Sequence, residues 1–345
     1  MKKKSKKDSK NTSFSNEKGW TEAFKSFNKH NVLIIGDVMI DAYMWGNVNR
    51  ISPEAPVPIV AINKKENRLG GAANVALNIQ AMGANPILCS VIGDDDGAKI
   101  FFELLRTQKL SSKGILKSKN RITTVKTRVI SNNHQMLRVD EEIESNIDAK
   151  EIQTLFAEIK KLIASEKINV IIFEDYDKGC INEELIKAVV DLAKQKGIPT
   201  VVDPKKKNFM VYTGITLFKP NLKELKEGLK TDFNHNNIKE LEKLVDGFIK
   251  KQNITTALIT LSEKGVYTHS AKTKALVPAH IRNIADVSGA GDTVVSIAAL
   301  CLASNLSPVT TATIANLAGG LVCEKVGVVP IDKKQLLAEA MKLKL

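Results

Sequence analysis

A short segment late in the sequence, Asp-Val-Ser-Gly-Ala-Gly-Asp-Thr at residues 286–293, combines carboxylates with an unusually adaptable backbone. Gly289, Ala290 and Gly291 allow a tight turn, and the apolar residues that follow are typical of a helix. The N–H groups and the dipole at the start of a helix form a site for anions. Asp292 lies within that turn. It could take a proton from an attacking hydroxyl while the N–H groups stabilise a transferring phosphoryl group.

Two candidate sites in the sequence also have purely structural interpretations. Ser288 could cap the helix, with Asp292 interacting favourably with its positive end. Asn221 is followed three residues later by Glu224, which is the spacing of a helix capping box. At the level of single residues, both alternatives stay open.

Beyond residue 30, short apolar runs alternate with amphipathic or small-residue stretches. The apolar runs predict buried strands at 32–36, 86–92, 170–173, 200–203, 216–219 and 257–260. The stretches around them predict helices at 72–82, 98–105, 149–165, 181–196, 238–251, 290–303, 308–325 and 333–343. Strands separated by helices form βαβ units, so we expect the α/β class, with a mainly parallel central sheet flanked by helices.

Two segments depart from this pattern and predict a small second sheet. Residues 50–58, Arg-Ile-Ser-Pro-Glu-Ala-Pro-Val-Pro, contain three prolines, which exclude a helix and a central strand. Residues 122–140 alternate apolar and polar side chains, as a half-exposed antiparallel hairpin does. We therefore expect a basic tail and lead-in at 1–30, and one domain at 31–345 with a lid formed by about 42–69 and 120–140.

Composition excludes several classes of protein. The 345 residues are 43% hydrophobic, which suffices for a large core and excludes a wholly disordered chain. The four cysteines are scattered and the five histidines share no metal-ligand spacing, so neither a disulfide framework nor a zinc site is expected. No apolar run approaches the roughly 20 residues of a membrane span. These features predict a cytoplasmic protein that does not bind membranes.

Part of the formal net charge of +13 is concentrated at the N-terminus. Residues 1–10 hold six Lys and one Asp, which together contribute +5. Such a tail could contact nucleic acid, and salt-sensitive binding that is lost on its deletion would identify that role. We favour a solvated leader, because aromatic residues for base stacking make up only 5% of the sequence.

Four motifs, in chain order, resemble those of the PfkB (ribokinase-like) carbohydrate kinases. Gly-Ala-Gly-Asp-Thr at the start of a late helix is similar to the C-terminal signature of that family. Asp41 resembles its early sugar-binding Asp, Gly70-Gly-Ala-Ala-Asn74 its glycine pair and sugar-binding Asn, and Asn221-Leu-Lys-Glu224 its NxxE motif. The resemblance spans about residues 31–331 and implies a ribokinase-like fold with a small β-sheet lid.

The resemblance also implies roles for individual residues. Asp292 would be the general base, and Gly289, Ala290 and Gly291 would offer N–H groups to the γ-phosphate of ATP. The ATP-binding residues would be Asn221, Leu222, Lys223, Glu224, Thr260, Gly265 and Asn316, with Glu224 holding Mg²⁺ through water. The sugar-binding residues would be Asp41, Gly70, Gly71, Asn74, Arg138, Lys178, Asp203 and Lys205. Family members often respond to K⁺, for which Asp286 and the Val287 carbonyl are candidate neighbours.

Within the family, one branch is most similar. The segments 36–41, 50–58, 201–205 and 216–221 resemble kinases of D-glycero-β-D-manno-heptose 7-phosphate. This implies ATP-dependent phosphorylation at C1, in ADP-heptose synthesis. A kinase for another sugar or sugar phosphate is the alternative. The intact Gly-Ala-Gly-Asp segment argues against a catalytically silent sugar- or nucleotide-binding protein.

The sequence departs from that branch at two positions. Glu174 and Asp177 stand where the branch usually has Ser and Gly, and they bring negative charge near a site for phosphates. Arg138, Lys178 and Lys205 are candidates for the substrate 7-phosphate, although each could equally be a solvated cation. The His-x-Gly-His signature of the accompanying adenylyltransferase is absent, so adenylylation is not expected of this sequence. The open face of the lid predicts a homodimer.

Overall fold

The computed structural model describes residues 17–132, 134–234 and 237–343, and most of the predicted basic tail, 1–16, lies outside that range. Its main sheet has nine strands in the order β13-β12-β11-β10-β9-β8-β1-β4-β5. The strands from β11 to β5 pair in parallel, whereas β12 and β13 are antiparallel. In chain order the strands are β1 Asn31–Gly36, β4 Asn85–Gly93, β5 Gly114–Ser118, β8 Ile168–Glu174, β9 Thr200–Asp203, β10 Leu217–Phe218, β11 Thr256–Thr260, β12 Val266–Ser270 and β13 Lys274–Val277. The prediction of a mainly parallel sheet is confirmed.

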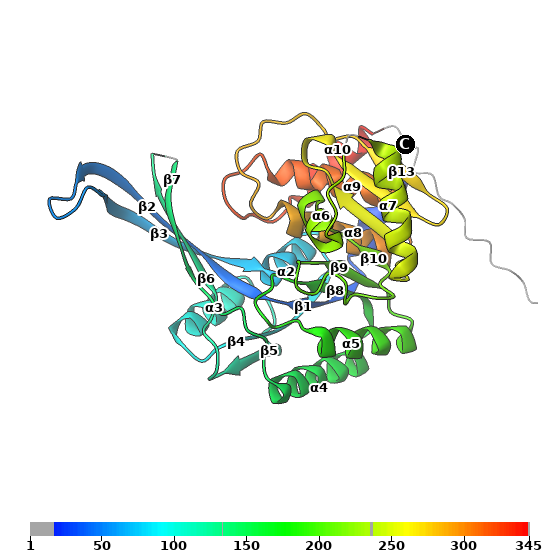
Figure 1. Ribbon diagram of the computed structural model, residues 1–345, viewed down its shortest axis with the longest axis horizontal. Coiled ribbons are helices and arrows are strands. Elements are labelled where there is room, and N and C mark those ends of the chain that lie inside the picture. Colours follow the sequence, from blue (N-terminus) through cyan, green and yellow to red (C-terminus); the bar gives the residue numbers. More distant parts are fainter. Residues whose placement is uncertain (1–16, 133, 235–236, 344–345) are drawn as a thin grey trace, which may run out of the picture.

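Helices cover both faces of this sheet, with α4 and α5 on the opposite side from α8 and α9 (Figure 1). One layer comprises α1 Glu17–Phe27, α2 Ala72–Ala81, α3 Asp96–Thr107, α8 Ala290–Ala303, α9 Pro308–Val322 and α10 Lys333–Met341. The other comprises α4 Ala149–Ser165, α5 Glu183–Lys196, α6 Leu222–Leu229 and α7 Ile238–Lys251. Sequence patterns missed α6 and the strands β5, β12 and β13. Within the described part of the chain, no helix is both long and apolar enough to cross a membrane.

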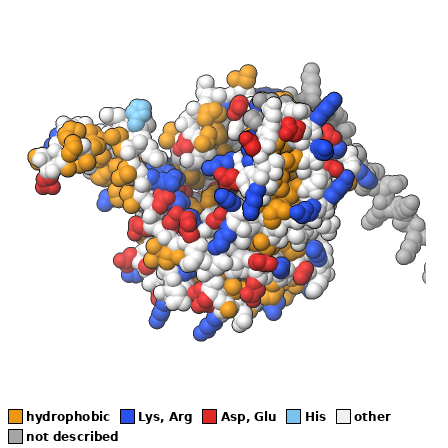
Figure 2. Space-filling view, viewed as in Figure 1, with side chains coloured by type: hydrophobic (Ala, Val, Ile, Leu, Met, Phe, Trp, Pro, Cys, Tyr) orange, Lys and Arg blue, Asp and Glu red, His pale blue; other side chains and the backbone are white. Residues whose placement is uncertain are grey.

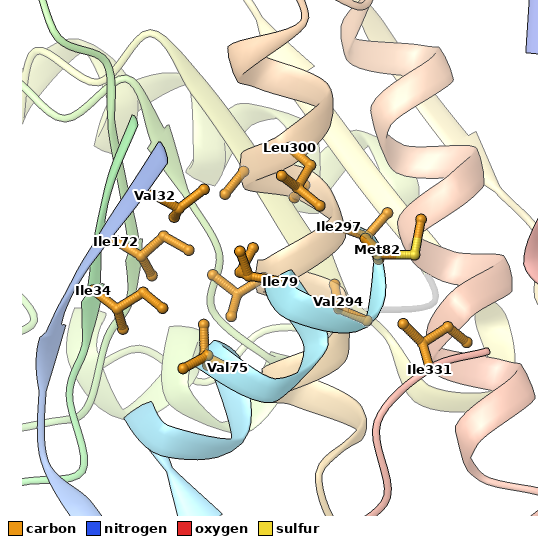
Figure 3. Close-up of a cluster of buried hydrophobic side chains, with 14 of the residues drawn as sticks. Val32, Ile34, Val75, Ile79, Met82, Ile172, Val294, Ile297, Leu300 and Ile331 are labelled. Atoms are coloured by element: carbon orange, nitrogen blue, oxygen red, sulfur yellow. The ribbon is translucent and has the colours of Figure 1, made fainter. Parts of the chain in front are cut away.

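The central strands are apolar throughout because both of their faces are buried. Along β8, Val170 and Ile172 pack toward α2 and α8, whereas Ile171 and Phe173 pack toward α4 and α5. Figure 3 shows Ile172 on the first of these faces, opposite Ile79 of α2. The last residue of each strand therefore presents its side chain to a defined layer at the carboxyl edge of the sheet.

A separate four-stranded sheet projects from the body of the molecule (Figure 1). Its order is β3-β2-β6-β7, with β2 Val38–Ile51, β3 Pro58–Gly71, β6 Val125–Ser131 and β7 His134–Glu141. β2 pairs antiparallel with β3 and parallel with β6, which joins the two hairpins. The predicted second sheet is confirmed. It exposes the apolar side chains of Ile51, Val57, Ile62, Met136, Leu137 and Val139.

Candidate active site

A cleft of about 820 Å³ opens at the carboxyl ends of the parallel strands. Most of the residues that the sequence predicted for catalysis and ATP binding line it: Asn221, Glu224, Thr260, Gly265, Gly289, Ala290, Gly291, Asp292 and Asn316. Asp203 and Lys205, which were predicted to bind the sugar, line it as well. Leu222 and Lys223 are in the first turn of α6 and do not line it. The fold thus brings together residues from segments far apart in the sequence.

The start of α8 forms one wall of this cleft. Gly289 precedes the helix with a φ of 79°, a left-handed conformation that glycine adopts without strain. Ser288 is not the N-cap, and no side chain caps this end. A Cβ on Gly291 would lie 3.6 Å from Asp203 Oδ2 and 3.7 Å from Lys219 Nζ. The start of α8 therefore faces the side chains of Asp203 and Lys219, and the absence of a side chain on Gly291 leaves space between them.

Asp292, in the first turn of α8, is buried and held by two hydrogen bonds. Asn74 Nδ2 donates to its Oδ2 at 2.7 Å, and the Tyr176 hydroxyl donates to its Oδ1 at 2.7 Å. Burial raises the pKa of Asp292 above its usual range, although both hydrogen bonds lower it. The carboxylate is thus fixed in orientation and kept basic, as a general base requires.

Sequence reasoning missed Tyr176 as a site residue. It lies in the segment Glu174–Gly179, in which sequence reasoning singled out only Glu174, Asp177 and Lys178. Besides its contact with Asp292, its ring lies 5.2 Å from Lys205 Nζ. Tyr176 therefore connects the proposed base to the opposite wall of the cleft.

The predicted sugar-binding residues near the small sheet lie close together. Asp41 on β2 is buried and forms an ion pair with Arg128 on β6. Arg128, like Tyr176, was not predicted as a site residue from the sequence. A Cβ on Gly70 would overlap Asp41 Oδ2, and one on Gly71, whose φ is 58°, would overlap the Asp37 carbonyl. Both glycines are needed for this close approach. After burial and the charge of Asp203, the negative charge of Asp41 is a further cause that raises the pKa of Asp292.

The three basic candidates for a substrate phosphate differ in position. Arg138 is half-exposed on β7 and pairs with Asp140 at 2.9 Å. Lys178 lies between Glu142 and Glu144, at 2.8 and 2.7 Å. Lys205 pairs instead with Glu224 in the cleft wall. Figure 2 shows such basic and acidic side chains gathered where the small sheet meets the body.

Asn221 and Glu224 form the capping box that their spacing predicts. Glu224 N–H donates to Asn221 Oδ1 and Asn221 N–H donates to Glu224 Oε2, both at 2.8 Å. Lys205 pairs with the other oxygen, Oε1. The structural interpretation of this pair is therefore confirmed, and the same residues also line the cleft.

Asp203 and Lys219 form a buried ion pair at 2.8 Å on the floor of the cleft. The remaining oxygen of Asp203, Oδ1, is buried and has no hydrogen-bond partner among the residues that the structure describes. Among the described residues, no group of three or more His, Cys, Asp or Glu is arranged to hold a metal ion by itself. Mg²⁺ commonly needs only one or two carboxylates when phosphates supply the other ligands.

The K⁺ candidate and the two departures also have defined places. Asp286 accepts hydrogen bonds from the N–H groups of Ser288 and Gly327, both at 2.9 Å. Asp177 is half-buried and accepts from Lys207 N–H at 3.3 Å. Glu174 is fully buried, and this burial, followed by the charges of Asp203 and Asp292, raises its pKa well above its usual range.

A comparison with known families decides the class of this site. The family model described as "pfkB family carbohydrate kinase" matches residues 29–334. The chain belongs to the pfkB family. Its members are carbohydrate kinases, so the resemblance found in the sequence is confirmed.

Individual relatives of this pfkB kinase agree with that assignment. It is 38% identical over 321 residues to the bifunctional protein HldE of Caulobacter sp. (strain K31), and 38% identical over 310 residues to that of Campylobacter jejuni subsp. jejuni serotype O:2. These alignments cover 92% and 90% of this chain, but it spans only 64% of the length of either relative.

Solved structures of low sequence identity share the fold. Phosphofructokinase-2 from Escherichia coli in complex with potassium superposes with a TM-score of 0.75 at 16% identity, covering 91% of this chain and 99% of that one. Ribokinase from Arabidopsis thaliana, complexed with ribose and ATP, gives a TM-score of 0.69 at 14% identity with the same coverage. The predicted ribokinase-like fold is confirmed.

Proposed function

We propose that this kinase transfers the γ-phosphoryl group of ATP to the C1 hydroxyl of D-glycero-β-D-manno-heptose 7-phosphate, giving the 1,7-bisphosphate. One observation carries the reaction: the Asp292 carboxylate, held by Asn74 and Tyr176, adjoins an uncapped helix start at the cleft. The choice of sugar is supported by the segments 36–41 and 50–58 and by the identity with proteins named HldE.

Each wall of the cleft has a part in this reaction. Asp292 takes the proton of the attacking hydroxyl, and Asp41 orients the sugar beside Gly70 and Gly71. The N–H groups at the start of α8 receive the transferring phosphoryl group. Lys205 and Lys219 lie on the nucleotide side, where they neutralise phosphate charge. Lys178 and Arg138 remain our candidates for the 7-phosphate.

The residues present fit a magnesium ion. The unpartnered, buried Asp203 Oδ1 is a hard oxygen ligand on the cleft floor, and Glu224 is nearby. When bound, Mg²⁺ supplies charge neutralisation for the transferring phosphate. K⁺ near Asp286 remains a proposal that rests on the family resemblance.

We also propose a cytoplasmic homodimer that forms through the small sheet. The four cysteines are free, which suits a reducing compartment. The exposed apolar residues of the small sheet offer a surface that a second copy could cover. Analytical ultracentrifugation of the protein and of a Leu137→Lys variant tests this, because only a dimer formed through the small sheet would be weakened by the added charge.

A substrate panel combined with Asp292→Asn tests the proposed reaction. ADP release should be fastest with heptose 7-phosphate, and slower with heptose, ribose and fructose 1-phosphate. Asp292→Asn keeps the shape of the side chain but cannot accept the proton, so kcat should fall by about 10²–10⁴-fold. Calorimetry should find ATP and sugar-phosphate binding within a few-fold of wild type. A folded variant that turns over at a near-normal rate would contradict the assignment of Asp292, and preference for another sugar would correct the substrate.

A further inference from the structure

The side chain of Glu174, the last residue of β8, has an unusual environment. It is fully buried, and neither of its carboxylate oxygens has a hydrogen-bond partner among the described residues. Its neighbour Asp175 shows the normal arrangement, because Asn208, Tyr212 and the Asp177 N–H all donate to it. A buried carboxyl group without partners is costly and calls for an explanation.

Strand geometry places Glu174 beneath the cleft. Side chains alternate along β8, so Glu174 shares the face of Ile172, which packs toward α2 and α8. Glu174 pairs in register with Asp203 on the adjacent strand β9, and laterally paired residues lie on the same face. Asp203 forms part of the cleft floor, and its Oδ1 is also buried without a partner. Two neighbouring strands thus end in carboxylates with three unpartnered oxygens between them.

The charges around this position do not balance. Lys219 pairs with Asp203 and Lys205 pairs with Glu224. Two carboxylates remain, and Asp292 is stabilised by its two hydrogen-bond donors. Glu174 has no such donor among the described residues, and the polyphosphate of a nucleotide in the adjacent cleft would add further negative charge nearby. A cation with oxygen ligands would supply what is missing.

We propose that Glu174 and Asp203 together hold the divalent cation that accompanies the nucleotide, with water and phosphate oxygens as its remaining ligands. Glu224, whose two oxygens already accept from Lys205 and Asn221, would then contribute through water rather than as a direct ligand. Two carboxylates plus substrate phosphates is a common ligand set for Mg²⁺. This inference rests on the proposed use of ATP.

Direct measurement of metal binding tests the proposal. Mn²⁺ serves as the probe, and electron paramagnetic resonance reports free Mn²⁺ in titrations of the enzyme saturated with ADP. Glu174→Gln, Glu174→Ser and Asp203→Asn should each raise the Kd for Mn²⁺ at least tenfold. Asp177→Asn, three residues from Glu174, is the matched control and should leave the Kd within twofold. Glu224→Gln should also leave it within about threefold.

The outcomes separate this inference from the proposed function. Unchanged Mn²⁺ affinity in folded Glu174→Gln or Glu174→Ser would overturn it, as would an equal loss in Asp177→Asn. A loss confined to Glu224→Gln would assign the cation to that residue instead. If Glu174→Gln does not fold, Glu174→Ser and Asp203→Asn decide the question. ADP binding measured in EDTA should be the same for the Glu174 variants and Asp177→Asn as for the wild type, and failure of the wild type to bind ADP would refute the proposed function rather than the metal ligands.

Discussion

The hydroxyl of Tyr176 donates a hydrogen bond that lowers the pKa of Asp292, and its removal should change how the enzyme responds to pH. Tyr176→Phe deletes the hydrogen bond of 2.7 Å to Asp292 Oδ1 and keeps the ring beside Lys205. Asn74 still donates to the other oxygen, so the carboxylate keeps one of its two anchors. The variant therefore changes the stability of the charged form without removing the base.

The size of the effect follows from the value of one hydrogen bond to a charged group. Such a bond is worth about 1.5–3 kcal/mol, and 1.36 kcal/mol corresponds to one pKa unit. Loss of the bond destabilises the carboxylate, so the pKa of Asp292 should rise by about 1–2 units. In the proposed mechanism, catalysis needs the ionised form of Asp292. The acidic limb of the kcat/KM profile should therefore move to higher pH by about 1–2 units, while kcat well above that limb stays within a few-fold.

Steady-state rates of ADP release between pH 5 and 9 measure this shift. Tyr212→Phe is the control. It loses a similar hydrogen bond, of 2.9 Å to Asp175, but this bond lies in the layer of α4 and α5 and not at the cleft. The substrate phosphate titrates identically in all reactions, so it cancels in the comparison. An unmoved acidic limb in Tyr176→Phe, or an equal movement in Tyr212→Phe, would refute the role assigned to the Tyr176 hydroxyl.

Three further perturbations probe the cleft, the sugar site and the core. Gly291→Ala should preserve or slightly raise the thermal midpoint of unfolding, because the new Cβ makes only ordinary contacts and alanine favours a helix over glycine by about 0.5–1 kcal/mol. Its kcat/KM should nevertheless fall at least tenfold, because the methyl group would occupy space that the transferring phosphate needs. Arg128→Met leaves Asp41 buried without its cation, so the sugar KM should rise at least tenfold with the ATP KM nearly unchanged; equal changes in both would indicate general disruption. Burial, followed by the charge of Asp37, raises the pKa of Asp175 to about 7, so the folded protein holds this proton more tightly than the unfolded chain. The protonated Asp175 therefore contributes its whole stabilisation below about pH 4, and this contribution falls by about 1.4 kcal/mol per pH unit as the pH rises toward 7. In denaturant titrations, the free energy of unfolding of Asp175→Asn should lack this dependence on pH.

Local patterns were sufficient for much of the fold and for the residues on turns. Buried strands and capped helices are marked by periodicity and by residues such as Asn182, which caps α5 as its type suggests. β13 was missed because its four residues alternate between exposed and half-buried positions at the sheet edge. The eight-residue helix α6 was too short for a periodic signal, although its capping box was recognised.

Contacts between distant segments could not be predicted in the same way. Tyr176 and Asp292 are 116 positions apart, and nothing around Tyr176 indicates that its hydroxyl reaches a carboxylate. The ion pair of Arg128 with Asp41 depends on the parallel pairing of β2 with β6, which no local pattern specifies. Lys205 was assigned to the sugar, but its side chain pairs with Glu224 of α6, because these residues follow β9 and β10, which are neighbouring parallel strands that end at the same edge of the sheet. Side-chain partners of this kind follow from the tertiary fold.

The connection between the two sheets has a mechanical consequence. β2 continues β1 after one residue, Asp37, whose carboxylate accepts hydrogen bonds from the N–H groups of Tyr176, Lys178 and Cys180 at 2.8, 3.1 and 3.0 Å. These hydrogen bonds hold the projecting sheet to the body of the molecule at Asp37, the point about which the sheet would rotate. At about 3.3 Å per residue, Asp41 lies about 13 Å from that point and Ile51 about 46 Å. Even a rigid swing would displace Asp41 by less than about a third as much as the tip, and bending at the bulge after Trp45 would displace it still less. A load on the outer strands would therefore displace Asp41, the proposed sugar-binding residue, much less than it displaces the tip of the sheet.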